Sequence, residues 1–351
     1  MSHFEERMEA DMNVIRNRLW KIGEDVEAAL HSAKKIMILR DSELAYKTVL
    51  GDYPINRDSR QCDRLCHTFI ARHLPGAGPL REMAATARVN VALERIGDYA
   101  VTISREALQI NAPVSEQLSR NIDAMFDESI TILADSRNSF RTGNADMAIA
   151  LMQQAKRVQN RMDGVYTILF AEDDHMDGAC MMAIFVVFSL LKRIIDQAKN
   201  ICDQTVYAVK GIAKMPKTYR ILFLDQPGSG LAQLAAAIGR KNYPASGFFV
   251  PATPGKADQL SKELREFLVE RGLPDENLVT ERLEVSKHDL DDFTVIVSLN
   301  GAYGDYISKV PFHTSALNWV LPEGSDLKQS YRVLLEEIQQ LMTLMAGNEA
   351  G

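Results

Sequence analysis

The first 212 residues carry apolar side chains at intervals of three and four positions and contain few glycines or prolines. Leu19, Ile22 and Val26 illustrate this spacing, which places apolar residues along one face of a helix. Clusters of glycine, proline and small polar residues interrupt the pattern at 51–54, 73–79, 111–115 and 141–146. The segment is therefore predicted to form about six long helices.

The pattern changes after residue 212. A short polar connector with a proline occupies 214–220, and beyond it short apolar runs alternate with amphipathic stretches. Strands are predicted at 221–224, 247–250 and 293–299, and helices at 231–241, 256–271 and 327–345. Strands separated by helices imply a parallel sheet. The sequence thus predicts two parts, an all-α bundle at 1–212 and a small α/β domain at 218–351.

The helical part contains an internal repeat. When Val91–Ser104 is laid on Ser189–Cys202, six of the fourteen positions carry the same residue, namely Leu, Arg, Ile, Asp, Ala and Ile. Average composition would produce only about one match. Two copies of a three-helix unit are therefore expected, at about 1–110 and 115–212, each burying part of its apolar face against the other.

Composition narrows the possible partners and the compartment. A net charge of −7 and a pI near 5.6, without any run of basic residues, argue against binding to nucleic acid or to an anionic membrane. The most apolar stretch, Ala179–Leu191, has thirteen residues, whereas a membrane-spanning helix needs about 20. We expect it to be a buried core helix. The first thirty residues hold no uninterrupted apolar run that could act as a signal sequence, so export is not expected.

All four cysteines lie within the first 202 residues, which fits a reducing cytoplasm. Cys62 and Cys66 are four positions apart and could direct both thiols, with His67 nearby, toward one zinc ion. Because no second ligand pair of the usual zinc spacing follows, ordinary half-buried thiols are the favoured interpretation.

Three acids of the first repeat could share a cation. Glu94 and Asp98 are four positions apart and therefore point to one face of their predicted helix, and Asp52 is expected to begin the preceding helix. Carboxylates on facing helices can hold iron, manganese or magnesium. Taken alone, such a pair is more often a solvated helix face.

The string LERIGDYA at 93–100 shifts that balance, because it strongly resembles the signature of the PhoU family, whose two three-helix repeats also match 1–212. The resemblance implies metal ions, Fe, Mn, Zn or Mg, held on acids of both repeats. This chain departs from the family pattern: Ala92 and Asn56 replace acids in the first repeat, and Lys192 and Gln159 replace acids in the second, where Asp196 remains. We therefore expect at most one metal-binding surface, formed by Asp52, Glu94 and Asp98, and an ion-paired surface at Asp196.

The same resemblance implies a function. PhoU-like proteins restrain phosphate uptake and phosphate signalling through contacts with the ATPase subunit of a phosphate transporter and with a membrane histidine kinase. The chain is accordingly expected to be a cytoplasmic regulator that reaches the membrane only through those partners and that forms a homodimer. A metal-storage bundle, which would hold several iron atoms per chain, is an alternative.

The α/β part begins with a strand, a glycine-bearing loop and a helix at 220–240. Backbone N–H groups of Gly228, Ser229 and Gly230 could face an anion at the positive end of the helix dipole. The alternative is that the glycines only permit a tight turn. This loop, together with the segments 289–300 and 319–324, resembles low-molecular-weight tyrosine phosphatases and the related arsenate reductases over about 218–346.

The residues that such enzymes need are missing. The resemblance places Asp225 at the nucleophilic cysteine and Leu231 at the anion-binding arginine, and no cysteine follows Cys202. Glu323 could occupy the general acid position, and Asn300 stands where a redox cysteine of the reductases would be expected. The domain is therefore predicted to be a non-catalytic binding module. A phosphatase or arsenate reductase with an atypical nucleophile, such as a phosphorylated Asp225, is the alternative.

Overall fold

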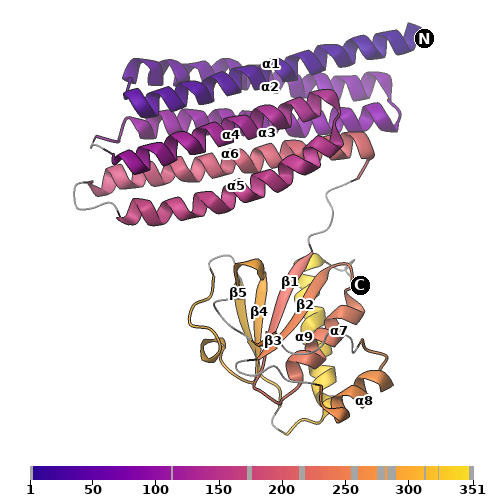
Figure 1. The fold of residues 1–351 in the computed structure, drawn as a ribbon. Coiled ribbons are helices and arrows are strands. Elements are labelled where there is room, and N and C mark those ends of the chain that lie inside the picture. The colour runs from indigo at the N-terminus through magenta and orange to yellow at the C-terminus, as the bar shows by residue number, and fades with distance from the viewer. Residues whose placement is uncertain are drawn as a thin grey trace. The chain divides into compact units, whose positions relative to one another are not determined.

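A computed structural model describes residues 3–111, 114–171, 176–212, 218–253, 260–274, 281–282, 290–311, 314–322 and 324–347. The chain divides into two compact units, Met1–Lys214 and Met215–Gly351. The first unit is a bundle of long helices, and the second is a sheet with helices packed on it (Figure 1).

The described part of the first unit forms two three-helix repeats. The helices are α1 His3–Leu39, α2 Ser42–His73, α3 Ala77–Ala107, α4 Glu116–Thr142, α5 Ala145–Ala171 and α6 Gly178–Lys210. Within each repeat every helix contacts the other two, and the repeats meet through α3 with α6 and α1 with α4. Figure 1 shows these helices lying alongside one another. The prediction of a bundle of two three-helix repeats is confirmed.

The predicted break at 51–54 is wrong, because α2 continues through Pro54. Proline inside a helix costs about 3 kcal/mol. That cost is outweighed here because Ile55 and Cys62, on one face of α2, are buried in the bundle core. The real break comes earlier: Arg40 adopts a positive φ of 57°, and Asp41 caps α2 by accepting a hydrogen bond from the Leu44 backbone N–H at 3.0 Å. Asp52 consequently lies inside α2 and does not begin it.

Helix α6 contains the most apolar stretch of the chain. By length and composition it is the one described helix that could cross a membrane. It packs against α3, α4 and α5, and half of its most apolar 18-residue window is buried. Ile184, Val187 and Leu191 have no exposed surface. The bundle therefore uses the stretch at 179–191 as a core helix.

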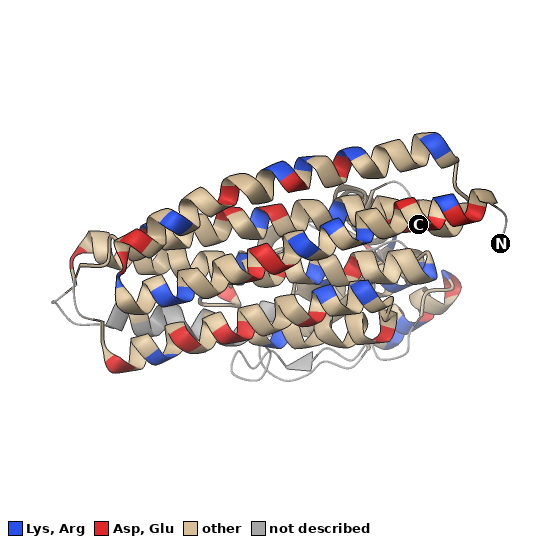
Figure 2. Cartoon of the chain, turned by 90° about the horizontal axis from the view of Figure 1, so that it is seen from above, with Lys and Arg blue, Asp and Glu red and all other residues tan. Residues whose placement is uncertain are grey.

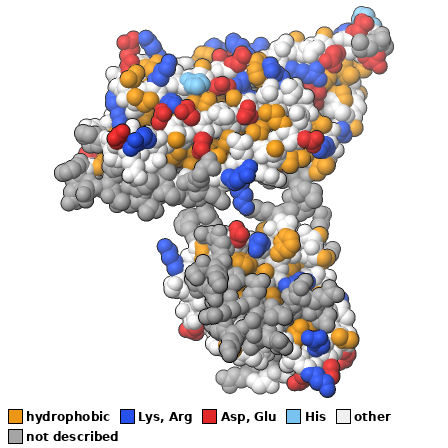
Figure 3. Space-filling view, in the orientation of Figure 1, with side chains coloured by type: hydrophobic (Ala, Val, Ile, Leu, Met, Phe, Trp, Pro, Cys, Tyr) orange, Lys and Arg blue, Asp and Glu red, His pale blue; other side chains and the backbone are white. Residues whose placement is uncertain are grey.

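Lys and Arg residues are interspersed with Asp and Glu residues along the bundle helices (Figure 2). On the face of the bundle seen in Figure 3, Lys and Arg likewise mix with Asp and Glu and with scattered hydrophobic side chains. On this face the positive charges are therefore not concentrated into the kind of positive field that attracts nucleic acid.

The second unit is built on a parallel sheet in the order β3-β2-β1-β4-β5. Its elements are β1 Tyr219–Leu224, α7 Leu231–Asn242, β2 Gly247–Thr253, α8 Lys262–Glu270, β3 Glu281–Arg282, β4 Val295–Leu299, β5 Ser315–Trp319 and α9 Leu327–Ala346. The predicted parallel α/β fold is confirmed. Strands β3 and β5 were not predicted, and the residues 254–259, where a helix was expected to begin, lie outside the described residues.

Alternate residues of β1 face two different cores. Ile221 and Phe223 pack with residues of α7 and α9, whereas Leu222 and Leu224 pack with Ile296 on the other side. From β1 the chain adds β2 and β3 on one side of the sheet, and it then crosses over to add β4 and β5 on the other side. The order in which strands are added therefore reverses between β1 and β4. The carboxyl ends of such strands are where open α/β sheets place their ligand sites.

Candidate functional site

The three acids predicted for the first repeat meet where α2 packs on α3. Burial raises the pKa of the Asp52 carboxyl, and the charge of Asp98 raises it further. Burial also raises the pKa of Glu94, with additional contributions from Asp98 and Asp52, and burial alone raises the pKa of Asp98. The three carboxylates therefore repel one another at a surface formed by two helices.

Asn56 belongs to the same cluster. Its Nδ2 donates a hydrogen bond of 2.5 Å to Asp52 Oδ2. The remaining oxygens, Asp52 Oδ1 and Asn56 Oδ1, are buried and have no hydrogen-bond partner among the described residues. Buried oxygens normally find a donor or a cation. The sequence comparison with PhoU proteins treats Asn56 as a lost acid, whereas the structure shows it as a further oxygen donor next to Asp52.

Gly97, inside the string LERIGDYA, was not recognised from the sequence as part of the site. A Cβ atom at this position would lie 3.3 Å from Asp52 Oδ1. Glycine in a helix costs about 1 kcal/mol relative to alanine. Here it lets the carboxylate of α2 approach the backbone of α3. The glycine of the signature thus has a structural role in seating Asp52.

The donor set suits a hard cation more than zinc. Carboxylate and amide oxygens are preferred by Mg²⁺ and Mn²⁺, whereas structural zinc sites use thiolates and imidazoles. No group of three or more His, Cys, Asp or Glu side chains within the described ranges is already arranged to hold a metal ion. To bind a metal ion, the carboxylates would therefore have to move closer together, namely those of Asp52, Glu94 and Asp98. The unpartnered oxygens of Asp52 and Asn56 would then be available as ligands.

We expect Asp98→Asn to stabilise the metal-free protein slightly. The pKa values of the three acids are raised in the folded protein, so folding favours their protonated forms. The stability that they contribute is therefore fully present below about pH 4 and is lost as the pH rises through the folded pKa values, where the ionised acids oppose folding. Removing one charge should add less than about 1 kcal/mol to the free energy of unfolding at pH 7, and the gain should shrink toward pH 4. Urea unfolding in a Trp319→Phe background, followed by Trp20 fluorescence with EDTA present, measures this difference.

The same variant tests the cation. MnCl₂ in place of EDTA should stabilise the natural protein and should leave Asp98→Asn unchanged. Glu43→Gln, at an exposed acid paired with Lys47 on α2, is the matched control and should respond as the natural protein does. An equal response of natural protein and Asp98→Asn to Mn²⁺ would remove this cluster from consideration as the metal site.

Asp196 of the second repeat is tied to side chains of its own repeat. Its Oδ1 accepts a hydrogen bond of 2.8 Å from Gln159 Nε2 of α5 and lies 3.5 Å from Lys199 Nζ, three residues along α6. Lys199 Nζ also donates to Gln159 Oε1 at 3.2 Å. Asp196 therefore forms an ion pair with Lys199 of its own helix. The arrangement neutralises Asp196 without a metal.

The cysteines of α2 do not form a metal site with His67. Cys62 and Cys66 face the bundle core and are 0% and 1% exposed. The imidazole of His67 is exposed and lies 3.5 Å from Asp63 Oδ2. Thiols and imidazole therefore point to different environments, which agrees with the interpretation of these cysteines as structural.

In the second unit, Asp225 fills the anion position of its own loop. The residue follows β1 and is 2% exposed. Its Oδ2 accepts hydrogen bonds from Ser229 Oγ at 2.7 Å and from the backbone N–H of Ala232, in the first turn of α7, at 2.8 Å. Ser229 Oγ in turn accepts the Leu231 N–H at 3.2 Å. An N–H group at the positive end of α7 thus serves a carboxylate of the protein itself. Of the backbone donors predicted to cradle an anion, the Ser229 N–H instead donates to the Gln226 carbonyl at 3.1 Å.

The remaining loop residues shape this arrangement. Gly228 and Gly230 have φ values of 82° and 73°, which residues other than glycine rarely adopt.

Two residues that follow β4 belong to the surroundings of this loop. Burial raises the pKa of Tyr306, and the nearby Asp225 raises it further. Asn300, also with a positive φ of 54°, accepts the Leu321 N–H at 2.7 Å. The expected acid Glu323 lies outside the described residues.

The helical unit has relatives of known family. A model of the PhoU domain matches residues 19–107. The phosphate-specific transport system accessory protein PhoU of Serratia marcescens is 30% identical over 212 residues, which make up 60% of this chain and 87% of that protein. The protein of the same name from Escherichia coli is 29% identical over 212 residues, 60% of this chain and 88% of that protein. The crystal structure of PhoU from Pseudomonas aeruginosa matches with a TM-score of 0.54 and 27% identity, over 58% of this chain and 99% of that one.

Proposed function

Because this chain belongs to the PhoU family through its helical unit, we propose that it acts as a regulatory accessory protein of a phosphate transport system. The observation that carries the proposal is the first repeat, where Asp52 and Asn56 of α2 meet Glu94 and Asp98 of α3 around Gly97. The helical unit has the family's fold, and it would act in the cytoplasm.

The proposed partners are the ATPase subunit of a phosphate transporter and a membrane histidine kinase that senses phosphate. The chain would restrain both when phosphate is plentiful. Binding of Mg²⁺ or Mn²⁺ at Asp52, Glu94 and Asp98 would neutralise that surface and fix the packing of α2 on α3. A second copy of the chain is also a proposed partner.

The α/β unit is proposed to be a binding module without catalytic activity. Its geometry supports this because Asp225 is buried and its Oδ2 is held by two donors, so the carboxylate is poorly placed to attack phosphorus. Leu231 provides no guanidinium to stabilise a transferring phosphoryl group. The competing reading, a phosphatase with Asp225 as nucleophile, finds no support in this arrangement.

Affinity capture tests the proposed regulatory role. Full-length tagged protein, isolated from its own cells grown with ample phosphate, should bring along the transporter ATPase subunit or the histidine kinase, identified by mass spectrometry. A variant carrying Glu94→Gln and Asp98→Asn should recover less of them if the carboxylate surface supports the contact. Recovery of neither partner from cells that contain both would contradict the proposal.

A further inference from the structure

A hollow of about 630 Å³ lies at the seam between the two repeats, away from the carboxylates of α2 and α3. Its walls come from α1 and α3 of the first repeat and from α4 and α6 of the second. Small-molecule sites in proteins have volumes of about 300–1,000 Å³ and favour such boundaries between packed elements. The size and position of this hollow are therefore those of a ligand site.

The interior of the hollow is mostly apolar. Met12, Leu19 and Val89 line it together with Leu93 and Phe140. Met12, Val89 and Leu93 are at most 3% exposed, which places them at its floor. Apolar hollows hold water poorly and accept apolar molecules. A ligand that fits must therefore bury a hydrocarbon or aromatic body there.

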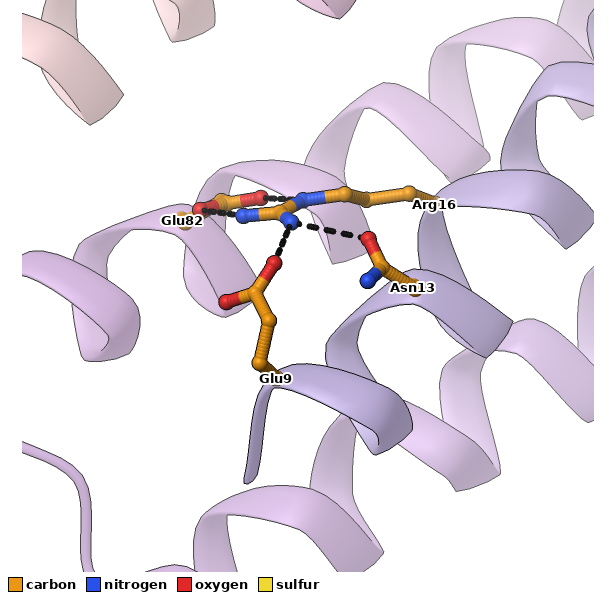
Figure 4. A network of polar contacts seen from close by, with 4 residues as sticks. All are labelled: Glu9, Asn13, Arg16 and Glu82. Carbon is orange, nitrogen blue, oxygen red and sulfur yellow. Dashed lines mark hydrogen bonds and ion pairs between the residues drawn. The ribbon is translucent and has the colours of Figure 1, made fainter. Parts of the chain in front are cut away.

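Two of the three arginines in the wall are already neutralised. Arg16 of α1 donates two hydrogen bonds to the Glu82 carboxylate of α3, from Nε at 2.6 Å and from Nη2 at 2.9 Å (Figure 4). Its Nη1 donates to Glu9 Oε1 at 2.6 Å and to Asn13 Oδ1 at 3.1 Å. Arg137 of α4 pairs with Glu27 of α1. Arg16 thus links two helices of the first repeat, and Arg137 links the second repeat to the first. Both guanidiniums have little remaining capacity for a ligand anion.

Arg141 is different, because it has no carboxylate partner in the part of the chain that the structure describes. Its Nη2 donates to Asn138 Oδ1 at 3.1 Å, and its guanidinium lies 4.1 Å from the centroid of the Trp20 ring. The side chain is exposed at the rim of the hollow. Trp20 and Arg141 thus provide a held cation, with unused N–H donors, next to an apolar interior.

We propose that this hollow binds an amphipathic anion, a molecule with an apolar chain and a single carboxylate or phosphate group. The chain lies between the repeats against Met12, Leu93 and Phe140, and the anionic group forms a charge-assisted pair with Arg141. Such a ligand would contact both repeats at once and would stabilise their association. The inference does not depend on the proposed role in phosphate transport.

Calorimetric titration of the full-length protein tests the site, with dodecanoate and dodecyl phosphate as the two anionic probes and dodecanol as the neutral one. We expect saturable binding of at least one anion and at least tenfold weaker binding of dodecanol. Arg141→Gln should weaken the anion at least tenfold and leave dodecanol unchanged. The two anions distinguish a carboxylate site from a phosphate site.

Two controls locate the binding. Lys47→Gln removes an exposed cation of α2 outside the hollow and should leave every affinity unchanged. Ala208→Phe, which adds a ring within the wall, should abolish binding, and in a Trp319→Phe background the remaining Trp20 should report the bound probe through its fluorescence. Absence of saturable binding by the natural protein, or an anion affinity in Arg141→Gln or in Ala208→Phe equal to that of the natural protein, would overturn the inference.

Discussion

Replacing Glu27 by alanine is expected to lower the free energy of unfolding of the helical unit by about 3 kcal/mol, because it leaves the Arg137 guanidinium buried without a counter-charge. The Arg137 side chain is only 5% exposed. It pairs with Glu27, donates to the Trp20 carbonyl at 3.4 Å and lies 4.5 Å from the Trp20 ring centroid. Burial already lowers the pKa of Arg137, so the environment opposes its charge.

The arginine cannot easily leave this position. It lies against Gly23 of α1, where a Cβ atom would come within 2.2 Å of the Arg137 Nε. The absence of a side chain at Gly23 creates the space that the guanidinium fills between α1 and α4. Arg137 therefore joins the two repeats, and loss of its counter-charge should weaken their contact.

Urea unfolding measures the effect of Glu27→Ala. In a Trp319→Phe background Trp20 is the remaining tryptophan and reports the helical unit alone. The double variant Glu27→Leu with Arg137→Met should recover most of the loss, because an apolar pair often replaces a buried ion pair without cost. Glu43→Ala, at an exposed pair, should change stability by less than about 1 kcal/mol. A Glu27→Ala effect as small as that of Glu43→Ala would show that the buried pair is unimportant.

Replacing Asp225 by alanine is expected to destabilise the α/β unit by about 2 kcal/mol and to make it sensitive to phosphate. The variant removes a helix cap and leaves Ser229 Oγ and the Ala232 N–H without their acceptor. It also vacates the position at the positive end of the α7 dipole that the carboxylate fills. Inorganic phosphate should then occupy the loop and restore part of the lost stability.

Trp319 provides the readout for Asp225→Ala. It packs 5.9 Å from the Phe223 ring in the core of the α/β unit, and in a Trp20→Phe background its fluorescence reports that unit alone. Phosphate should raise the unfolding midpoint of Asp225→Ala and leave that of the parent unchanged. Asp326→Ala removes the cap of α9, where Asp326 accepts the Gln329 N–H at 2.7 Å, and serves as a matched control. A phosphate response equal in parent and Asp225→Ala would mean that the carboxylate does not fill the anion position.

The sequence was sufficient to predict the architecture, because helical periodicity, the repeat and the alternation of strands and helices are local signals. It failed at Pro54, where burial of Ile55 and Cys62 outweighs a local helix breaker. Strand β5 was missed because its residues, Ser-Ala-Leu-Asn-Trp, lack a run of β-branched side chains and only Trp319 is buried.

The candidate sites show a similar division. The acids Asp52, Glu94 and Asp98 could be read from spacing and family resemblance, but the roles of Gly97 and Asn56 depend on the distance between two helices. The loop after β1 was recognisable from its glycines. That Asp225 turns back to cap α7 is a tertiary arrangement, and no local pattern indicates it.

The central claim, that the helical unit makes the regulatory contact and that the α/β unit performs no chemistry, can be measured by titrating the full-length protein with the transporter ATPase subunit. We expect saturable binding with the same affinity for the natural chain and for Asp225→Ala, and no hydrolysis of an aryl phosphate by either protein. Absence of binding, or phosphate release that Asp225→Ala abolishes, would contradict the claim.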